Sequence, residues 1–474
     1  MSGGEIAPTG QDEALSRILA AFYTSLSAEA LPEATLHAVR RHVLDTLGAA
    51  LAGARQPEPN AVMEAGDALG GREGNAIVWG RAERASPALA ALVNGTAAHA
   101  LELDDASGCD HSGAVVVPAI FAALPLAPRA TDSDLVAAVV AGYDLGRRVL
   151  EAAGGYDAHN NAGWHSTGTC GVFASTIAVA RLRGLPAAVT QHALGIAGSF
   201  ASGNWSFMQD GAMTKRLHPG QAASAGLAAT ELAVRGMTGP AHVFDAPWGG
   251  FLSTYARLDA DPAALVGGLG EAWRIHRSSI KPFASCRGTH AAVEAVLDLR
   301  SEIEGGAAQI DVRVTPTVAR MCGGHAISSL VDAQMSLPYA LSVAWLHGAA
   351  DLPRFSDEVR NSASVRDWLP RVRVIADPGI ASNVSASVAL RLPDGEVHER
   401  SIKSPIGSWD RPLPDAELRR KYRSLASPVL GEEQAGDLEQ HVFALGSGAR
   451  PATLATLLAK TGAKSGASSR KDQA

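Results

Sequence analysis

Four short segments of this chain place histidine, lysine, arginine or acidic residues just ahead of a small-residue, apolar stretch. They are residues 102–113, 164–168, 214–220 and 281–290. Where such a stretch forms a helix, its N-terminus presents free backbone N–H groups and a partial positive charge, which attract carboxylates. Segments that also supply Lys, Arg and His would suit a small polyanion handled by proton transfer. If the four converge, we expect an enzyme that acts on a carboxylic acid.

The first segment holds His111, just ahead of the apolar stretch 114–124. Ser112 could cap a helix there and leave His111 beside its N-terminus. The adjacent acids Asp104 and Asp105 could orient the histidine or set its pKa, because a nearby carboxylate favours the charged imidazole. Two alternatives stay open: His111 as a solvent-exposed loop residue, and the two acids as simple helix caps.

Two further segments carry His165, Lys215 and His218. His165 stands directly before another helical pattern, and packing against the helix start explains it as well as catalysis does. Lys215 and His218 lie in a segment that we expect to be a loop ahead of a helix at 221–235. A flexible basic loop is one interpretation, whereas the aromatic residues shortly before it favour a partly buried lysine.

The segment 281–290 has the highest density of chemically useful residues. It contains Lys281, Arg287 and His290, with Cys286 beside them and a helical pattern following. Arginine grips a carboxylate in a bidentate way, and lysine supplies a proton or a point charge. An exposed basic loop is the alternative. Cys286 has no recognisable base partner in the sequence, so we interpret it as lining a pocket rather than as a nucleophile.

Other chemistries find no support in the sequence. Nucleotide-binding motifs of the GxxxxGK[ST] and GxGxxG types are missing, as are HExxH and GxSxG, and no His or acidic pair has recognisable metal-ligand spacing. The net charge of −7 and the 5% of aromatic residues argue against nucleic acid as a partner. We therefore expect neither a nucleotide nor a metal site.

The composition predicts a cytoplasmic globular protein. The four cysteines are widely separated, which favours reduced thiols over disulfides or a zinc site. The first residues lack the pattern of a signal peptide, and no uninterrupted apolar run reaches the roughly 18 residues of a membrane span. A chain of 474 residues exceeds the usual size of one core, so two domains are expected.

Apolar residues recur at helical spacing through the first part of the chain. The predicted helices cover residues 14–27, 32–52, 86–103, 114–124, 133–153, 169–182, 186–201 and 221–235. Residues 75–79 could form an isolated strand or an extended connection.

The pattern changes after about residue 273. Alternation predicts strands at 311–315, 371–376 and 385–392, with a turn at 393–395 leading into a hairpin strand at 396–401. Helices are expected between them at 289–304 and 336–345, and afterwards at 414–426 and 432–443.

This order predicts a mainly α fold. A large all-helical domain is formed by both chain ends, residues 1–270 and 406–474, and a smaller α+β domain, residues 271–405, is inserted between them. Residues 1–12 and 463–474 are expected to be disordered.

Several ordered blocks resemble the MmgE/PrpD family, whose members include 2-methylcitrate dehydratases, cis-aconitate decarboxylases and iminodisuccinate epimerases. The blocks are residues 42–53, 94–105, 213–223, 281–290 and 332–339, so the resemblance covers nearly the whole chain. It implies the two-domain organisation, a homodimer, and an active site in the cleft that needs no metal or organic cofactor.

The resemblance also assigns site residues. It implies catalytic roles for His111, His165, Lys215, Lys281 and Tyr339, and places Glu102 where the decarboxylases carry aspartate. Substrate contacts or support are expected from the remaining candidates: Asp104, Asp105, His218, Cys286, Arg287 and His290.

Three departures leave the branch of the family open. Cys286 stands where the decarboxylases have histidine, Ala106 replaces a threonine, and the loop to His111 is one residue shorter. The Trp-Gly-His-Pro-Ser-Asp stretch usual in the dehydratases is absent as well. These positions are therefore expected to decide which acid is accepted.

The chemistry that the family shares is removal of a proton next to a carboxylate. We expect a cofactor-independent lyase or hydratase of a small di- or tricarboxylate, with His111 or Lys215 as the base. Epimerisation of an iminodisuccinate-like acid, decarboxylation of an aconitate-like acid, and carboxylate binding without catalysis are the alternatives.

Overall fold

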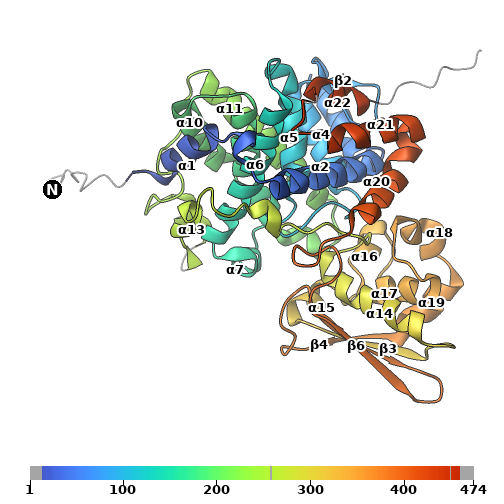
Figure 1. Ribbon diagram of the computed structural model, residues 1–474. Helices are drawn as coiled ribbons and strands as arrows, with labels where there is room; N and C mark the ends of the chain where they lie inside the picture. Colours follow the sequence, from blue (N-terminus) through green and yellow to red (C-terminus); the bar gives the residue numbers. More distant parts are fainter. Residues whose placement is uncertain (1–12, 257–258, 449, 460–474) are drawn as a thin grey trace, which may run out of the picture.

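The computed structural model describes residues 13–256, 259–448 and 450–459 (Figure 1). The fold is mainly helical with one small region of sheet, which confirms the predicted class. The segments expected to be disordered, 1–12 and 463–474, lie outside the described residues.

The helices of the first part of the chain pack into one body (Figure 1). Most of the predicted helices form, with ends shifted by a few residues. The bounds are α1 Leu15–Thr24, α2 Glu33–Gly53, α3 Pro57–Ala68, α4 Pro87–His99, α5 Ser112–Ala123, α6 Asp132–Ala152, α7 Gly155–Asn161, α8 Ser166–Thr169, α9 Gly171–Leu182, α10 Ala187–Ala197, α11 Thr214–Val234, α12 Phe251–Tyr255 and α13 Ala263–Val266. The segment 75–79 contributes a short strand, β1 (Ala76–Ile77), which pairs with β2 (Arg84–Ala85).

The last helices return to this body beside the first ones (Figure 1). They are α20 (Asp415–Leu430), α21 (Glu432–Phe443) and α22 (Pro451–Leu457). Helix α20 packs along α2, and Lys421 on α20 donates to Asp45 on α2 at 2.6 Å and to the carbonyl of Leu103 at 2.7 Å. The two chain ends thus share one body.

The middle of the chain forms a four-stranded sheet covered by helices. The strands β3 (Gln309–Val314), β4 (Val372–Ala376), β5 (Ala386–Arg391) and β6 (Val397–Ile402) lie in the order β4-β3-β5-β6. The β5–β6 pair is antiparallel, which confirms the predicted hairpin. Its turn uses Gly395 at φ +94°, a conformation that glycine adopts without strain.

Helices α14 (His290–Glu302) and α17 (Leu337–His347) pack against this sheet on the side that faces the helical body (Figure 1). The other helices of this region are α15 (Pro316–Cys322), α16 (Leu330–Gln334), α18 (Asp357–Arg360) and α19 (Ala363–Trp368).

The buried apolar side chains form two clusters. One is built from residues 19–280 and 413–458, and the other from residues 284–390 with a few side chains of the helical body. Trp273, Ile275 and Ile280 belong to the helical cluster. The packing supports a discontinuous helical domain, but the change of core lies after Ile280 rather than at residue 270. The predicted division into domains stays a prediction.

The start of α11 differs from the prediction. The helix begins at Thr214 rather than at residue 221, so Lys215 and His218 lie in its first turns and not in a loop. Pro219 favoured a prediction that the helix starts after it, because proline disrupts the interior of a helix. Proline lacks only its own N–H, however, so a helix that has just begun loses one bond, to the carbonyl of Lys215. Lys215 is therefore held on a rigid, buried element.

The start of α5 also differs. Ser112 does not cap the helix, because its Oγ accepts from the backbone N–H of Cys109 at 2.8 Å. The N–H of Gly113 instead donates to Asp105 at 2.9 Å. Asp105 is thus the residue that satisfies the helix start.

Helices α4 and α11 approach each other at two glycines. A Cβ at Gly95 would lie 2.6 Å from Cα of Gly220, and a Cβ at Gly220 would lie 2.2 Å from the carbonyl oxygen of Leu92. This close approach brings the start of α11 against the loop that follows α4. Among the described residues, no helix is long and apolar enough to cross a membrane.

Alanine at position 220 should strain this contact. We expect Gly220→Ala to lower the free energy of unfolding by about 3 kcal/mol, because the added methyl meets backbone that cannot move aside. Chemical denaturation measures the effect. Gly436→Ala in α21 is the matched control, since its Cβ meets nothing within 4 Å and should stabilise the helix by up to about 1 kcal/mol. Equal effects at the two positions would contradict the packing argument.

Candidate active site

A single buried carboxylate joins three of the predicted segments. Glu102 accepts from Lys215 and Arg216 at one oxygen and from Lys281 at the other, the latter at 3.0 Å. Lys281 also donates to the backbone carbonyl of Glu102 at 3.2 Å. All four side chains are buried. Three cations less one carboxylate leave this group, the Glu102 cluster, with a net charge of +2.

Charge inside the Glu102 cluster holds its members ionised. Burial alone would raise the pKa of Glu102, but Lys215, Lys281 and Arg216 outweigh it and hold that pKa well below its usual range. Burial would lower the pKa of Lys281, but Glu102 and Asp104 raise it. Glu102 and Lys281 therefore stabilise each other's charged forms.

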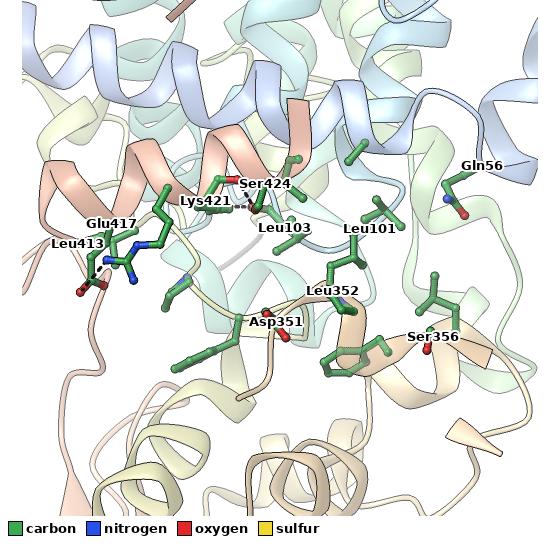
Figure 2. Close-up of a pocket in the computed structure, with 18 of the residues that line it drawn as sticks. Gln56, Leu101, Leu103, Asp351, Leu352, Ser356, Leu413, Glu417, Lys421 and Ser424 are labelled. Carbon is green, nitrogen blue, oxygen red and sulfur yellow. Dashed lines mark hydrogen bonds and ion pairs between the residues drawn. The ribbon is translucent and has the colours of Figure 1, made fainter. Parts of the chain in front are cut away.

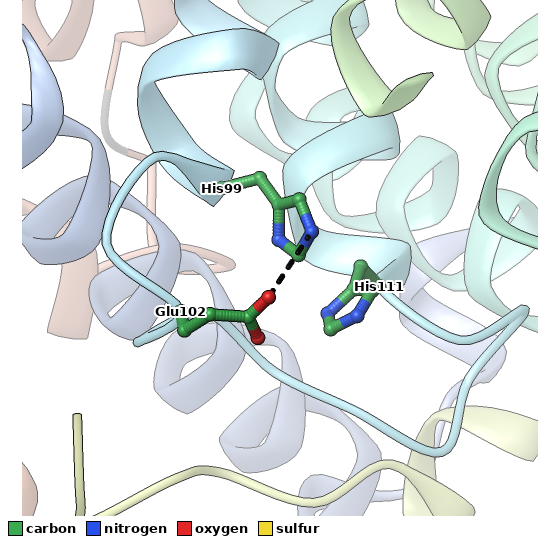
Figure 3. A group of neighbouring side chains, drawn as sticks. All are labelled: His99, Glu102 and His111. Carbon is green, nitrogen blue, oxygen red and sulfur yellow. Dashed lines mark ion pairs between the residues drawn. The ribbon is translucent and has the colours of Figure 1, made fainter. Parts of the chain in front are cut away.

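A second group, drawn in part in Figure 3, surrounds Asp104. His99 Nδ1 lies 2.9 Å from one oxygen of Asp104, and His111 Nδ1 lies 3.0 Å from the other. The Nδ1–H of His111 also reaches the carbonyl of Asp105 at 2.8 Å. The ring is fixed through Nδ1, so its Nε2 is left for chemistry.

Asp105 has a structural role. One oxygen accepts from the N–H of Gly113, and the other accepts from the Tyr143 hydroxyl at 2.7 Å. His42 Nδ1 lies 3.3 Å from the same oxygen as the tyrosine. Asp105 therefore fixes the start of α5 and with it the position of His111.

His165 lies at the start of α8, packed between aromatic rings. Its ring centroid is 5.0 Å from that of Trp205 and 5.8 Å from that of Phe207. Its Nδ1 lies 2.7 Å from Nδ1 of His218, so one ring must donate and the other accept. When His165 donates, its Nε2 carries the lone pair and lies 3.3 Å from the Thr167 hydroxyl.

The two candidate catalytic histidines have opposite electrostatic surroundings. Burial, with His218 and Lys215, holds the pKa of His165 well below its usual value. Burial also acts on His111, but Asp110 and Asp104 outweigh it and raise the pKa of His111. His165 is therefore neutral near neutral pH, and His111 holds a proton more readily.

These groups border a cavity of about 450 Å³ between the two cores. Asp110 and Cys286 lie in its wall, and the Glu102 cluster lies behind that wall. Arginines also face the cavity: Arg147, Arg277 and Arg287. The cavity can thus offer guanidinium groups to carboxylates, and its wall residue Asp110 lies 3.7 Å from His111 Nε2 and 3.8 Å from His165 Nε2, although neither histidine lines the cavity itself.

The loop before α5 is strained. Among the described residues, the non-glycine residues with positive φ are Glu102 at 54°, Ser107 at 69° and Asp110 at 108°, all in this loop. Such conformations cost energy and persist only where the surroundings fix them, which is common at active sites. The loop therefore serves to place side chains rather than merely to connect helices.

Cys286 has a thiol neighbour. Its pKa is lowered to about 7, first by a hydrogen bond with Cys322 and further by the charge of Lys215, although burial opposes this. Cys286 lines the cavity, whereas Cys322 is fully buried. The position is consistent with the expected pocket lining.

The remaining candidates lie farther from the histidines. Arg287 donates to Ser408 and contacts His290 Nδ1 at 3.1 Å, and His290 Nε2 lies 3.1 Å from the carbonyl of Ser285. Tyr339 is buried, and its hydroxyl donates to the carbonyl of Arg354 at 2.6 Å. Among the described residues, neither His290 nor Tyr339 has a hydrogen bond or ion pair to the Glu102 cluster, although burial, Arg287 and Lys281 lower the pKa of His290. Their expected roles stay predictions.

A larger cavity of about 720 Å³ lies on the other side of the same loops (Figure 2). Leu101 and Leu103, which flank Glu102, face it, as do Pro282 and Phe283. Neither candidate catalytic histidine lines either cavity, but Asp110 in the wall of the smaller one lies 3.7 Å from His111 Nε2 and 3.8 Å from His165 Nε2. The smaller cavity is therefore the better candidate for the chemistry despite its size.

Two groups of side chains have ligand atoms within 4.8 Å of one another, close enough to hold a metal ion: His99, Glu102 and His111, and Asp110, His111 and His165. The first shares Glu102 with three cations. A divalent cation there would meet the field of these cations, so the surroundings of the first group favour proton transfer. In the second group, burial and Lys215 lower the pKa of His165, whereas Asp110 and Asp104 outweigh burial and raise the pKa of His111.

Sequence reasoning missed Arg216, His99 and Asp110 as members of the site. Arg216 adjoins the candidate Lys215, but the sequence alone does not indicate that it contacts Glu102. His99 precedes Glu102 by one helical turn, a spacing that could have drawn attention to it. Asp110 adjoins His111, but only the backbone conformation shows where its side chain lies.

Replacing Glu102 tests the Glu102 cluster. We expect Glu102→Gln to lower the free energy of unfolding by about 3–5 kcal/mol at neutral pH, because three buried cations lose their carboxylate. Since the folded-state pKa of Glu102 is depressed, its contribution is complete above the unfolded value of about 4.3. It is lost as pH falls through the folded value, so the difference from wild type should narrow in acid.

Urea denaturation at neutral pH and at a pH of about 3, clearly below the unfolded pKa of Glu102, measures both effects. Glu399→Gln on β6, where the residue is exposed, is the control and should change little. A Glu102→Gln protein as stable as wild type at neutral pH would show that the cations need no carboxylate.

Two family models match most of the chain. Residues 17–262 match the MmgE/PrpD N-terminal domain, and residues 283–446 match the MmgE/PrpD C-terminal domain. Three relatives are similar over most of their length. The cis-aconitate decarboxylase-like protein oryM of Aspergillus oryzae is 28% identical over 92% of this chain and 95% of its own.

The cis-aconitate decarboxylase of Aspergillus terreus is 28% identical over 89% of this chain and 91% of its own, and that of Homo sapiens is 27% identical over 84% and 85%. The family matches cover most of both cores, three of the four segments that carry the candidate residues, and the fourth from residue 283 onward, so that Lys281 lies just outside them. This chain therefore belongs to the MmgE/PrpD family.

Proposed function

We propose that this protein is a lyase that eliminates water from a small hydroxylated carboxylic acid with two or three carboxylates, through a carbanion next to a carboxylate. The proposal rests on the buried net charge of +2 in the Glu102 cluster. Beside the cluster lie two histidines whose pKa values are shifted in opposite directions, that of His165 downward and that of His111 upward. A carbanion next to a carboxylate spreads its charge onto oxygen, and a preorganised positive field stabilises that charge.

The histidine surroundings suggest which group is the base. Paired titratable groups whose pKa values are pushed apart commonly divide the acid and base roles. His165, whose pKa is held well below its usual value, is the better base, and His111, whose pKa is raised, is the better acid. This differs from the assignment favoured by sequence, which gave the base role to His111 or Lys215. Lys215 is held on Glu102 and serves better as a fixed charge.

The proposed step can be written with its atoms. His165 Nε2 takes a proton from the carbon next to one carboxylate, and the electron pair left on carbon is stabilised by the Glu102 cluster. The carbon–oxygen bond at the neighbouring carbon then breaks as His111 gives its proton to the leaving hydroxyl. The products are water and an unsaturated acid, with His165 protonated and His111 neutral.

Decarboxylation is the second candidate. The relatives named as cis-aconitate decarboxylases align over most of this chain, and loss of CO₂ can proceed through the same kind of stabilised carbanion. Ala106 and Cys286 stand where the resemblance placed other residues in the decarboxylases, and both lie in the cavity wall. These differences place decarboxylation second. The stretch usual in the dehydratases is absent too, so turnover assays decide between the two reactions.

Turnover assays separate the two reactions. We expect hydroxylated di- and tricarboxylates to give a new alkene absorbance without release of CO₂. Lys215→Ala should lower kcat by about 10²–10³-fold, comparable to loss of one oxyanion-stabilising donor, with the helical circular dichroism unchanged. Lys403→Ala, at an exposed position, is the control. An unchanged kcat in Lys215→Ala would contradict the mechanism. Release of CO₂ from an unsaturated acid would favour decarboxylation, the second candidate.

The pH dependence tests the histidine assignment. We expect a bell-shaped profile of kcat/KM: activity falls in acid as His165 becomes protonated, below its ordinary pKa of about 6.5, and falls in alkali as His111 loses its proton, above that value. His111→Gln should lower the rate by about 10²–10⁴-fold and remove the alkaline limb. An alkaline limb that persists in this variant would assign the acid to another group.

A further inference from the structure

Asp110 is the least satisfied acid of the site. Its side chain is 10% exposed and lies in the wall of the 450 Å³ cavity. One carboxylate oxygen is 3.7 Å from His111 Nε2 and 3.8 Å from His165 Nε2, both beyond hydrogen-bond distance. The backbone holds it there at φ 108°. Asp110 therefore lies between the two groups assigned to move protons.

The neighbouring acids of the same loop are all engaged. Glu102 accepts from three cations, Asp104 from two histidines, and Asp105 from a backbone N–H and a tyrosine. Among the described residues, no hydrogen bond reaches the carboxylate of Asp110. Its oxygens are not among the buried side-chain atoms without a partner, so they are open to the cavity, where a hydroxyl or amino group of a ligand can donate to them.

The arginines of the cavity are held by other partners. Arg147 binds Glu151 and the carbonyl of Ser107, and Arg287 donates to Ser408. They can receive substrate carboxylates without satisfying Asp110. The cavity thus combines cationic positions with one acceptor position between the histidines.

We propose that Asp110 accepts a hydrogen bond from a hydroxyl or amino group of the substrate and selects a small dicarboxylate that carries such a donor over a tricarboxylate. A third carboxylate placed here would face the carboxylate of Asp110, and like charges a few ångströms apart repel. The inference rests on the proposed function for its location and names the substrate class of that site. It also explains why a hydroxyl would lie within reach of the acid, His111.

Binding of inert or slowly converted probes tests the selectivity without requiring turnover. Isothermal titration calorimetry would compare succinate, 2-hydroxysuccinate, 2-aminosuccinate and propane-1,2,3-tricarboxylate on the full chain. For wild type, we expect the hydroxy or the amino compound to bind at least about tenfold more tightly than succinate, since hydrogen bonds to charged groups exceed about 1.4 kcal/mol. The tricarboxylate should bind more weakly than either preferred compound.

Asp110→Asn keeps the size and tolerates positive φ. In this variant the preference over the tricarboxylate should fall by about tenfold or more. This variant also distinguishes a hydroxyl donor from an amino donor. The amide oxygen of asparagine still accepts from a hydroxyl, so 2-hydroxysuccinate should retain part of its affinity advantage over succinate. In contrast, 2-aminosuccinate should lose the attraction between its ammonium group and the carboxylate of Asp110.

Asp157→Asn is the matched control. Asp157 faces the same cavity but already accepts from Asn383 at 2.7 Å, so its variant should keep the wild-type preference. Thermal unfolding checks that both variants are folded. If Asp110→Asn is misfolded, Asp110→Gly, which suits the positive φ, takes its place with the same expectation.

An unchanged preference in a folded Asp110 variant, or tighter wild-type binding of the tricarboxylate, would overturn the inference. Failure of all probes to bind would overturn it as well. If the probes bind with the expected preference but none is converted, the proposed lyase reaction is contradicted while the role of Asp110 in binding stands.

Discussion

The organisation of the site depends on one buried carboxylate that gathers cations from distant parts of the chain. Glu102 follows α4, Lys215 and Arg216 lie at the start of α11, and Lys281 comes after the last residues of the helical core. Without Glu102 these cations would repel one another in a medium that screens them poorly. Glu102 holds the three cations together as a fixed group with excess positive charge, and this group lies next to the cavity.

The backbone around this group shows how the arrangement is maintained. The close approach at Gly95 and Gly220 brings α11 against the loop that contains Glu102. Asp105 anchors the other end of that loop to α5, and the positive φ values between them record the strain. Packing on both sides thus fixes a loop that would not adopt this form by itself, which is how preorganisation for charge stabilisation is obtained.

The sequence predicted the elements better than the contacts. Helical periodicity located α21 at the residues where it occurs, 432–443, because an amphipathic pattern depends on local spacing. It put the start of α11 too late, because the effect of Pro219 depends on its position within the helix. The convergence of His111, Lys215 and Lys281 could be inferred from similar segments, but not that Arg216 shares Glu102 with them. That pairing depends on how two helices cross. The unsatisfied state of Asp110 depends on a single backbone angle.

The measurement that tests the account most directly is solvent exchange at carbon. The protein would be incubated in D₂O with 2-hydroxysuccinate, and proton NMR would follow the hydrogens next to the carboxylates. The account predicts deuterium incorporation together with formation of the unsaturated acid, and loss of both in His165→Asn with the fold retained. Exchange and product formation that persist in His165→Asn would contradict the proposed base, and product formed by loss of CO₂ would contradict elimination.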